Sequence, residues 1–376
     1  MKLSYKNNFW GYFIFYYSII GNRVILYLAL SILISVMDGL GLVMFIPLLE
    51  FVGNESKVDG GEQTLGYLHY IIDFIRSLGL KLNVTTILGA LTTLFVLKGV
   101  LKYIQLTYYA NMRALFIKKI RYKLIDNLQG LSYNAFLKLE AGKIQNTFTT
   151  EVTRLFLSMT SYFNAAQYFF MLSTYIVLAI MANYQFAILV AMGSGISSLI
   201  YRKIYQTTKR SSIELSKKGG DAQGFVVQTI HYFKYLKSTN MFGIYADKLK
   251  QTIDKYEQLN KKMGYLKAVT LSIKEPIIII VVSAVILFQM NWMGTGLNTI
   301  LLSLLLFYRA LSLLVQVQND WQTFMENIGG IYAVSDSDNE MTLAQEVHGG
   351  IIFKGIKQGI NLKDIVLHYD SVKAIN

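Results

Sequence analysis

Six stretches of this chain are apolar and long enough to cross a lipid bilayer, and this feature limits the possible folds more than any other. They lie near residues 24–49, 84–108, 156–181, 184–204, 268–290 and 297–318. A helix of about 20 residues spans the hydrocarbon core of a bilayer. A helix also hydrogen-bonds its own backbone, which a segment surrounded by lipid requires. The sequence therefore predicts an all-α membrane protein with six transmembrane helices.

Composition agrees with a lipid environment. Hydrophobic residues make up 53% of the chain, charged residues only 16%, and the mean hydropathy is +0.39. Soluble domains carry about 25% charged residues. The absence of cysteine excludes a disulfide framework, a thiolate metal site and a cysteine nucleophile. The histidines at positions 69, 231, 348 and 368 are too scattered for a metal site, so we predict neither a metal ion nor a catalytic residue.

Positive charge is distributed unevenly among the connections. The connections GNESKVDGGEQ, ANYQ and NWMGTG contain little Lys or Arg. The two long connections are rich in both, at residues 113–143 and 202–262. Because Lys and Arg accumulate in cytoplasmic loops, we predict that both long connections and both termini are cytoplasmic and that the protein lies in the inner membrane of the cell. This topology explains the net charge of +13, and no nucleic-acid partner is expected.

The first 22 residues contain an apolar and aromatic run, FWGYFIFYYSII, between Lys6 and Arg23. A secretory signal would also place lysines before an apolar run, but no small-residue cleavage pattern follows. Trp and Tyr are typical of the membrane–water boundary. We therefore predict an interfacial helix that lies on the inner leaflet.

The second predicted span continues as a helix beyond the membrane. Residues 84–128 contain no proline, and at 1.5 Å per residue they form roughly 65 Å of helix, about twice the thickness of the bilayer core. The chain turns at LSYNAFLKLEAG and returns from Gly142, and the fourth and fifth spans turn similarly at residues 229–243. Each turn carries aromatic residues: Tyr133 and Phe136 in the first, and Tyr232, Phe233 and Tyr235 in the second. We predict a partner surface there, the alternative being that these side chains pack within their own hairpins.

Several ionisable residues fall at membrane depth, among them Asp38, Lys98, Lys102 and Arg309. Such residues are costly in lipid and usually face a cavity or a partner. We predict a cationic inner cavity that receives an anionic headgroup or pyrophosphate. The alternatives are that both lysines extend to the inner headgroups and that Arg309 forms a structural pair with Asp38. Glu275, which precedes Pro276, is interpreted as the beginning of a helix.

The C-terminal region changes in periodicity. GIIFKGI and NLKDIVLHY alternate apolar and polar residues, as strands do. We therefore divide the chain into an interfacial helix at 1–22, a membrane domain with long cytoplasmic helical extensions at 23–335, and a linker with a short β-rich stub at 336–376. Two strands cannot bury an apolar face alone, so we expect residues 336–376 to be mobile or only locally ordered.

This order of features resembles an exporter-type ABC transporter subunit over the whole chain. FYRALSLLVQVQNDWQTFMENIGGIYAV at residues 307–334 is similar to the sixth span of that family, and SDSDNEM is similar to the linker that leads into its nucleotide-binding domain. NLKDIVLHYDS is similar to the opening of that domain. DGLGLVMFIPLLEF at residues 38–51 is similar to the first span of the subgroup that includes lipid-linked oligosaccharide flippases, which often has Glu where this chain has Asp38.

The resemblance implies a function for several parts of the chain. It implies a homo- or heterodimer that moves a lipid or lipid-linked saccharide outward, with Tyr369 stacking on adenine and with Tyr133, Phe136, Phe233 and Tyr235 contacting a nucleotide-binding domain that uses ATP and magnesium. No G-x-x-x-x-G-K-[ST] phosphate loop occurs in the sequence. We therefore expect a subunit truncated at the start of its motor domain, which alone binds no cofactor and does not hydrolyse ATP.

Three alternatives stay open. A peptide or drug exporter of the same family would share these features, although no peptidase-like segment precedes the first span. A secondary carrier would also have apolar spans with a buried charge, but its helices rarely project far into the cytoplasm. A membrane scaffold without transport could use the two hairpins to bind a partner.

Overall fold

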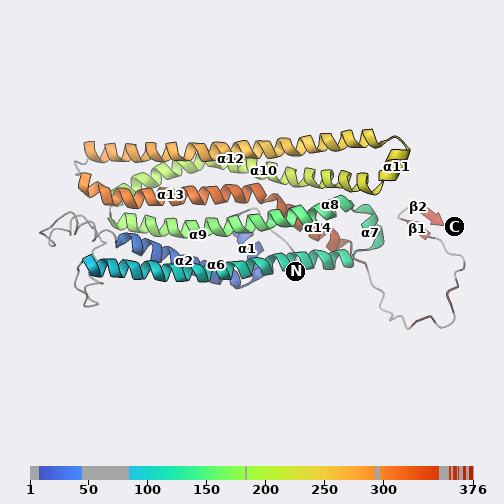
Figure 1. Ribbon diagram of the computed structural model, residues 1–376, viewed down its shortest axis with the longest axis horizontal. Helices are drawn as coiled ribbons and strands as arrows, with labels where there is room; N and C mark the ends of the chain where they lie inside the picture. The colour runs from blue at the N-terminus through green and yellow to red at the C-terminus, as the bar shows by residue number, and fades with distance from the viewer. Residues whose placement is uncertain are drawn as a thin grey trace.

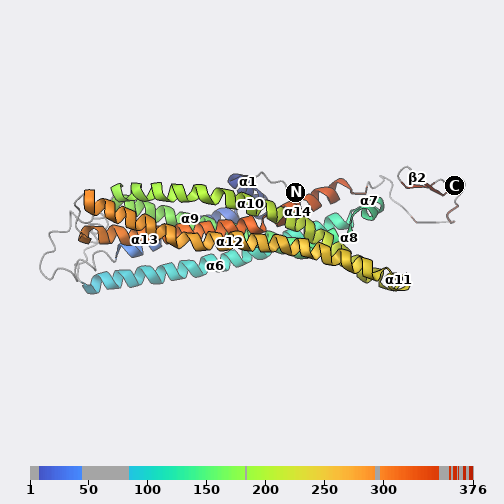
Figure 2. The same ribbon diagram turned by 90° about the horizontal axis from the view of Figure 1, so that it is seen from above.

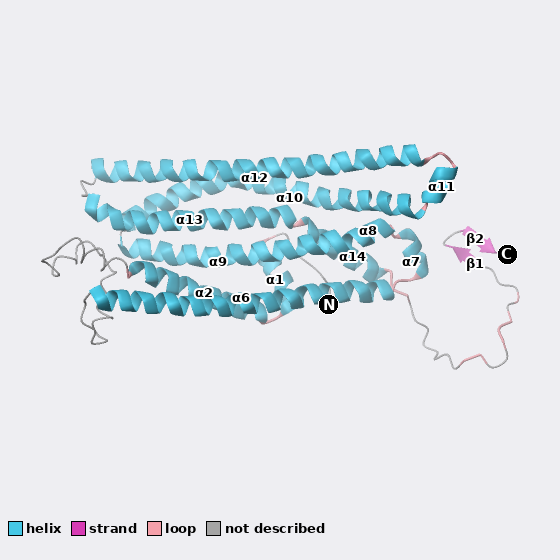
Figure 3. Ribbon diagram, viewed as in Figure 1, coloured by secondary structure: helices cyan, strands magenta, loops and turns pink. Residues whose placement is uncertain are grey.

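The computed structural model describes residues 8–44, 84–182, 184–292 and 297–346, and short parts of 355–375 that include two strands. Several predicted features lie outside the described residues. These are the end of the first predicted span, the connection GNESKVDGGEQ, the last four residues of NWMGTG, most of GIIFKGI and part of NLKDIVLHY. Helices dominate the described part of the chain (Figure 3).

Six helices longer than 20 residues lie side by side in the described part of the chain (Figure 1). They are α2 (Arg23–Val43), α6 (Val84–Gln129), α9 (Val152–Ala182), α10 (Tyr184–His231), α12 (Phe242–Trp292) and α13 (Leu297–Asn327). Each includes most of one of the six predicted spans. Among the described residues, three helical segments are long and apolar enough to cross a membrane: Arg23–Val43, Val84–Gln129 and Ala141–Met181.

Three of these helices are much longer than a bilayer requires. They are α6 with 46 residues, α10 with 48 and α12 with 51. At 1.5 Å per residue each extends for roughly 70 Å or more. The projecting ends form the two predicted hairpins. The prediction that Glu275 and Pro276 begin a helix is wrong, because α12 begins at Phe242 and continues through Pro276.

Short helices turn the chain at the tip of each hairpin. In the first hairpin α7 (Tyr133–Lys138) and α8 (Ala141–Asn146) lead through a π-helical turn, η2 (Thr147–Glu151), into α9. The Ser132 side chain caps α7 by accepting a hydrogen bond from the Ala135 N–H. In the second hairpin α11 (Phe233–Ser238) connects α10 to α12. The two tips, α7 and α11, lie apart from each other (Figure 2).

The N-terminal helix α1 (Phe9–Ile20) packs on the bundle with one aromatic face. Tyr12, Phe15 and Tyr16 are buried, and Tyr16 donates or accepts a hydrogen bond with Ser158 of α9 at 3.0 Å. The opposite face, which includes Trp10, is exposed. The helix is therefore two-sided, as an interfacial helix must be, although its position relative to lipid stays a prediction.

The C-terminal helix α14 (Gly329–Leu343) crosses the domain boundary that the sequence suggested at residue 335. The predicted linker SDSDNEM is helical, and Ser335, Ser337, Asp338 and Met341 within it are buried. Further along, β1 (Leu367–Tyr369) pairs antiparallel with β2 (Val372–Ile375). The end of NLKDIVLHY is thus a strand, as predicted, and it pairs with the segment that follows it.

Glycines permit the closest helix crossings. A Cβ atom on Gly330 would lie 2.5 Å from the Leu155 backbone nitrogen and 2.8 Å from the Glu151 carbonyl oxygen. A Cβ atom on Gly142 would lie 2.1 Å from the Gly224 Cα atom. Backbone atoms cannot move aside as a flexible side chain can, so these crossings exclude any side chain.

We expect Gly330→Ala to destabilise the folded protein by about 1–3 kcal/mol, because the new methyl group would overlap the backbone of α9. The matched control is Gly264→Ala in α12, where an added Cβ meets no other atom within 4 Å. That change should be neutral or slightly stabilising, since alanine favours a helix over glycine. Thermal unfolding of both purified variants in detergent measures the difference, and equal melting temperatures would contradict the packing argument.

Candidate functional site

Asp38 lies near the C-terminal end of α2 in the predicted membrane region, and its side chain is only 5% exposed. A buried carboxylate is costly unless it is paired and hydrogen-bonded. Three helices supply its partners. Lys98 of α6 forms an ion pair with Oδ1, the Tyr175 hydroxyl of α9 donates to Oδ2 at 2.8 Å, and Arg309 Nη2 of α13 lies 3.7 Å from Oδ2.

The glycines that follow Asp38 allow α2 to approach its neighbours. A Cβ atom on Gly39 would lie 2.7 Å from Thr174 Cγ2 of α9, and one on Gly41 would lie 3.2 Å from Phe95 Cε2 of α6. The sequence DGLG therefore combines a charge with the small residues that bring its partners within reach. We call Asp38, Lys98, Tyr175 and Arg309 the charge cluster.

The charge cluster contains three of the four predicted cavity residues. Lys102 is separate, because its ammonium group donates to Gln105 Oε1 at 3.0 Å, and Gln105 in turn donates to Ser31 of α2 at 2.7 Å. The alternative pairing of Arg309 with Asp38 is present, but Lys98 shares the same carboxylate. Two cations and one anion leave the charge cluster with a net positive charge.

The two cations are not fully enclosed. The Lys98 side chain is 25% exposed and the Arg309 side chain is 43% exposed. Arg309 also lies over the Tyr175 ring, with its guanidinium carbon 6.0 Å from the ring centroid. Part of each cation is therefore accessible from outside the described subunit, while the carboxylate is not. This arrangement can bind an anion without exposing Asp38.

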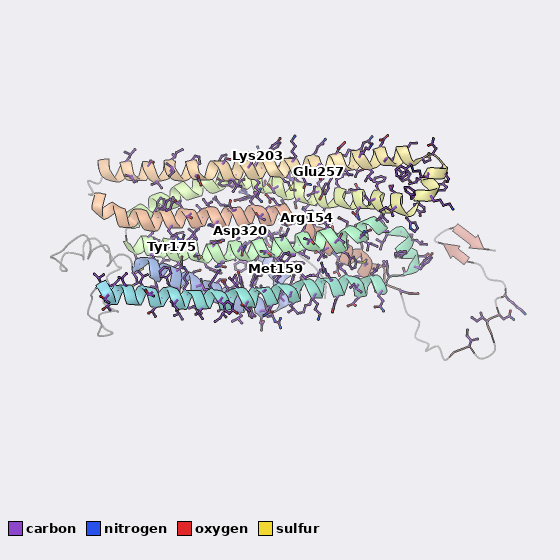
Figure 4. The ribbon with its side chains drawn as sticks, in the orientation of Figure 1. Arg154, Met159, Tyr175, Lys203, Glu257 and Asp320 are labelled. Atoms are coloured by element: carbon purple, nitrogen blue, oxygen red, sulfur yellow. The ribbon has the colours of Figure 1, made fainter. Side chains whose placement is uncertain are left out.

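A second buried polar group, which the sequence did not reveal, lies between α9, α10 and α13. Arg154 of α9 is buried and donates to the Ser212 hydroxyl at 2.7 Å and to the Glu326 carbonyl oxygen at 2.9 Å. Those two bonds use Nη2; the other terminal nitrogen, Nη1, donates to the Ser216 hydroxyl and lies 3.4 Å from Glu151 Oε2. Figure 4 shows Arg154 and Tyr175 at different levels along α9.

This Arg154 network provides hydrogen-bond partners for backbone groups at the end of α13, where α14 begins. The Glu326 carbonyl oxygen also accepts from the Ser212 hydroxyl at 2.7 Å, and the Gly329 N–H donates to that hydroxyl at 3.0 Å. It thus joins α9, α10, α13 and α14. The signal that could have found it is the pair Glu151 and Arg154, three residues apart in the otherwise apolar run EVTRLFLSM.

The hairpin tips present the predicted aromatic residues to the outside. Tyr133 and Phe136 on α7, and Phe233 and Tyr235 on α11, are all exposed. Phe233 also packs within its own hairpin, which was the alternative prediction, because its ring lies edge-on against Phe242. For Tyr369 only the strand is described and not the side chain, so its stacking on adenine stays a prediction.

A comparison with known protein families identifies the family of the membrane domain. A family model for the ABC transporter transmembrane region matches residues 24–315, which is more than half of the chain. The chain belongs to this family. No curated protein matches it. The match includes α2, α6, α9, α10 and α12, and it ends within α13 just after Arg309.

The family agrees with the helical bundle described above. This ABC exporter membrane subunit is an all-α, membrane-embedded protein, and transmembrane domains of this family generally form dimers and pair with a nucleotide-binding domain. The charge cluster lies within the matched region, as do both hairpin tips.

We expect Lys98→Gln and Arg309→Gln to be tolerated better singly than together. Each single change leaves one cation near Asp38. The double change leaves a buried carboxylate without a cation, which costs about 3–5 kcal/mol. Adding Asp38→Asn to the double variant should recover most of the lost stability.

Thermal unfolding in detergent of the two singles, the double and the triple variant measures this coupling. The double variant should lose more stability than the sum of the singles, because the two cations share one partner. Strictly additive losses, or no recovery in the triple variant, would show that the charges act independently.

Proposed function

We propose that this subunit moves an anionic, amphipathic substrate, a lipid or a lipid-linked saccharide, outward or between the leaflets of the membrane. The observation that carries the proposal is the charge cluster, in which two partly exposed cations share one buried carboxylate. Ionisable residues within membrane segments usually mark a substrate pathway. The surplus positive charge favours a phosphate-bearing headgroup, and the apolar helices around it favour lipid chains.

The strength of such a contact depends on its surroundings. A charge-assisted hydrogen bond is stronger where water is scarce, because the effective dielectric constant is lower than in bulk water. Arg309 suits this role better than Lys98, since its guanidinium group is more exposed and farther from the carboxylate. Its planar fork also matches the oxygens of a phosphate group.

We further propose that all six long helices cross the membrane, with both termini and both hairpins on the cytoplasmic side of the inner membrane. The charge bias of the connections supports this orientation. In the same arrangement α1 lies along the inner leaflet, with its exposed Trp10 face toward the headgroups.

Energy would reach the bundle through the hairpin tips. We propose that α7 and α11 dock on a nucleotide-binding domain that binds ATP and magnesium, and that two such subunits form a homo- or heterodimer. The support is the exposed aromatic cluster at each tip, held far from the bilayer by helices roughly twice as long as a bilayer is thick.

The role in substrate binding can be tested in a subunit joined to its nucleotide-binding domain and reconstituted in lipid. We expect Arg309→Gln to lower the stimulation of ATP hydrolysis by an anionic lipid about tenfold, the loss of one charge-assisted contact. Basal hydrolysis should persist, because Arg309 is far from the motor. The control is Lys250→Gln, which changes an exposed lysine on α12. Stimulation equal to that of the unchanged protein would remove Arg309 from the substrate path.

The role of the tips is tested by four alanine substitutions, at Tyr133, Phe136, Phe233 and Tyr235, in the same complete subunit. Because these side chains are exposed, we expect normal melting temperatures. Substrate-stimulated hydrolysis should fall toward the basal rate. The control is Tyr265→Ala, which changes a similarly exposed tyrosine on α12 rather than at a tip. Unfolding of the tip variants would instead show that the aromatic residues stabilise their own hairpins.

A further inference from the structure

The two hairpin tips are held in different ways. The most extensive contacts of α11 are with α10 and α12, the two helices that it connects. The loop before α7, in contrast, is hydrogen-bonded to the segment that follows α14, about 210 residues later in the chain. This difference has no counterpart in the sequence pattern, where both hairpins look alike.

Residues 344–346 form a short strap across this loop. The Ser132 N–H donates to the Ala344 carbonyl oxygen at 3.0 Å, and the Glu346 N–H donates to the Gly130 carbonyl oxygen at 2.8 Å. Leu131 and Gln345 thereby face each other as an antiparallel bridge. The Gln345 amide donates to the Met341 carbonyl oxygen at 2.7 Å and to the carbonyl oxygen of Asn127 in α6 at 2.9 Å.

A buried ion pair also holds α14, at a position that precedes the strap in the chain. Asp338 of α14 is buried, and its two oxygens accept from Lys123 at 2.6 Å and from the Asn127 side chain at 2.7 Å. Both partners lie on α6, just before the loop that the strap crosses. Because each carboxylate oxygen has a donor, the burial of Asp338 is compensated, and α14 is fixed in register against α6.

The other side of α14 contacts the returning part of the first hairpin. Lys143 of α8 pairs with Glu340 at 2.7 Å, and Thr147 shares a hydrogen bond with Ser337 at 3.1 Å. Partial burial raises the pKa of the Asp336 carboxyl, the charge of Glu340 raises it further, and Lys143 opposes both effects. Helix α14 is therefore held both by α6, which precedes α7 in the chain, and by α8, which follows it.

We propose that α14 and the strap form a clamp that locks α7 to the segment leaving the bundle, so that the two tips have different mechanical roles. The clamped tip, α7, is a fixed contact that moves with the C-terminal segment, and α11 is a movable contact carried by its own hairpin. Leu343 at the end of α14 is 89% exposed, and it adds an apolar side chain beside α7 to the surface that a partner would meet. The mechanical assignment rests on the proposed docking of both tips on a motor domain.

Hydrogen exchange in lipid tests the clamp on this chain without any motor domain. Amides of residues 131–139 should exchange about tenfold or more slowly than those of 232–241, since a clamped segment opens less often. Asp338→Ala combined with Gln345→Ala should speed exchange at residues 131–139 and leave 232–241 unchanged. Equal protection of both tips, or equal acceleration at both, would overturn the proposal.

A reversible cross-link tests whether the clamp stays closed during turnover. The chain has no cysteine, so Leu131→Cys and Gln345→Cys can be introduced as the only pair. Opposed residues of an antiparallel bridge have Cα atoms about 4.5–5.5 Å apart, which suits a disulfide. We expect oxidation to close the bond in high yield. In the complete subunit, stimulated ATP hydrolysis should stay within about twofold of the rate after reduction.

Each outcome of the cross-link decides something. A low yield would show that the strap is not held beside the loop, and activity that is lost on oxidation and restored on reduction would show that the two must separate. Either result overturns the clamp. If tip substitutions leave coupling unchanged while exchange still shows one protected tip, the motor-docking proposal fails and the clamp stands.

Discussion

Lipid cannot hydrogen-bond to a peptide group, and this constraint determines most of the architecture. It makes each span a helix. Helices of 46 to 51 residues are longer than the bilayer is thick, so they continue beyond the membrane surface. The same helices therefore form both the membrane bundle and the two long hairpins. A charge within the bundle has to find its partners on neighbouring helices, as Asp38 does on α6, α9 and α13. Fold and candidate site thus follow from one property of the solvent.

Much of this fold could be predicted from the sequence, because its signals are local. The apolar runs gave the positions of the long helices, and the aromatic residues at the turns are exposed where they were expected to be. The match to the ABC transporter transmembrane region confirms the family. Two local signals misled. Pro276 is tolerated inside α12. The acidic SDSDNEM is a partly buried helix rather than a linker, because Lys123 pairs with the Asp338 carboxylate and Asn127 donates a hydrogen bond to it.

The partners of each polar side chain could not be predicted, because they depend on which helices become neighbours. Lys98 and Lys102 share a face of α6, yet one joins Asp38 and the other joins Gln105. The Arg154 network and the strap join residues that are 58 to 218 positions apart. The need for glycine at positions such as Gly330 could not be predicted either, since only the packed structure shows which backbone lies against them.

The Arg154 network has a consequence for biosynthesis. Arg154 and its neighbour Glu151 are made early, but the other acceptors arrive with Ser212 and Ser216 on α10 and finally with Glu326 at the end of α13. Until then Glu151 is the one member of the Arg154 network that is already present, and water must serve the remaining N–H groups of the guanidinium. A nascent chain that stalls before the end of α13 therefore exposes an arginine with an incomplete set of hydrogen bonds, by which an unfinished subunit differs from a finished one.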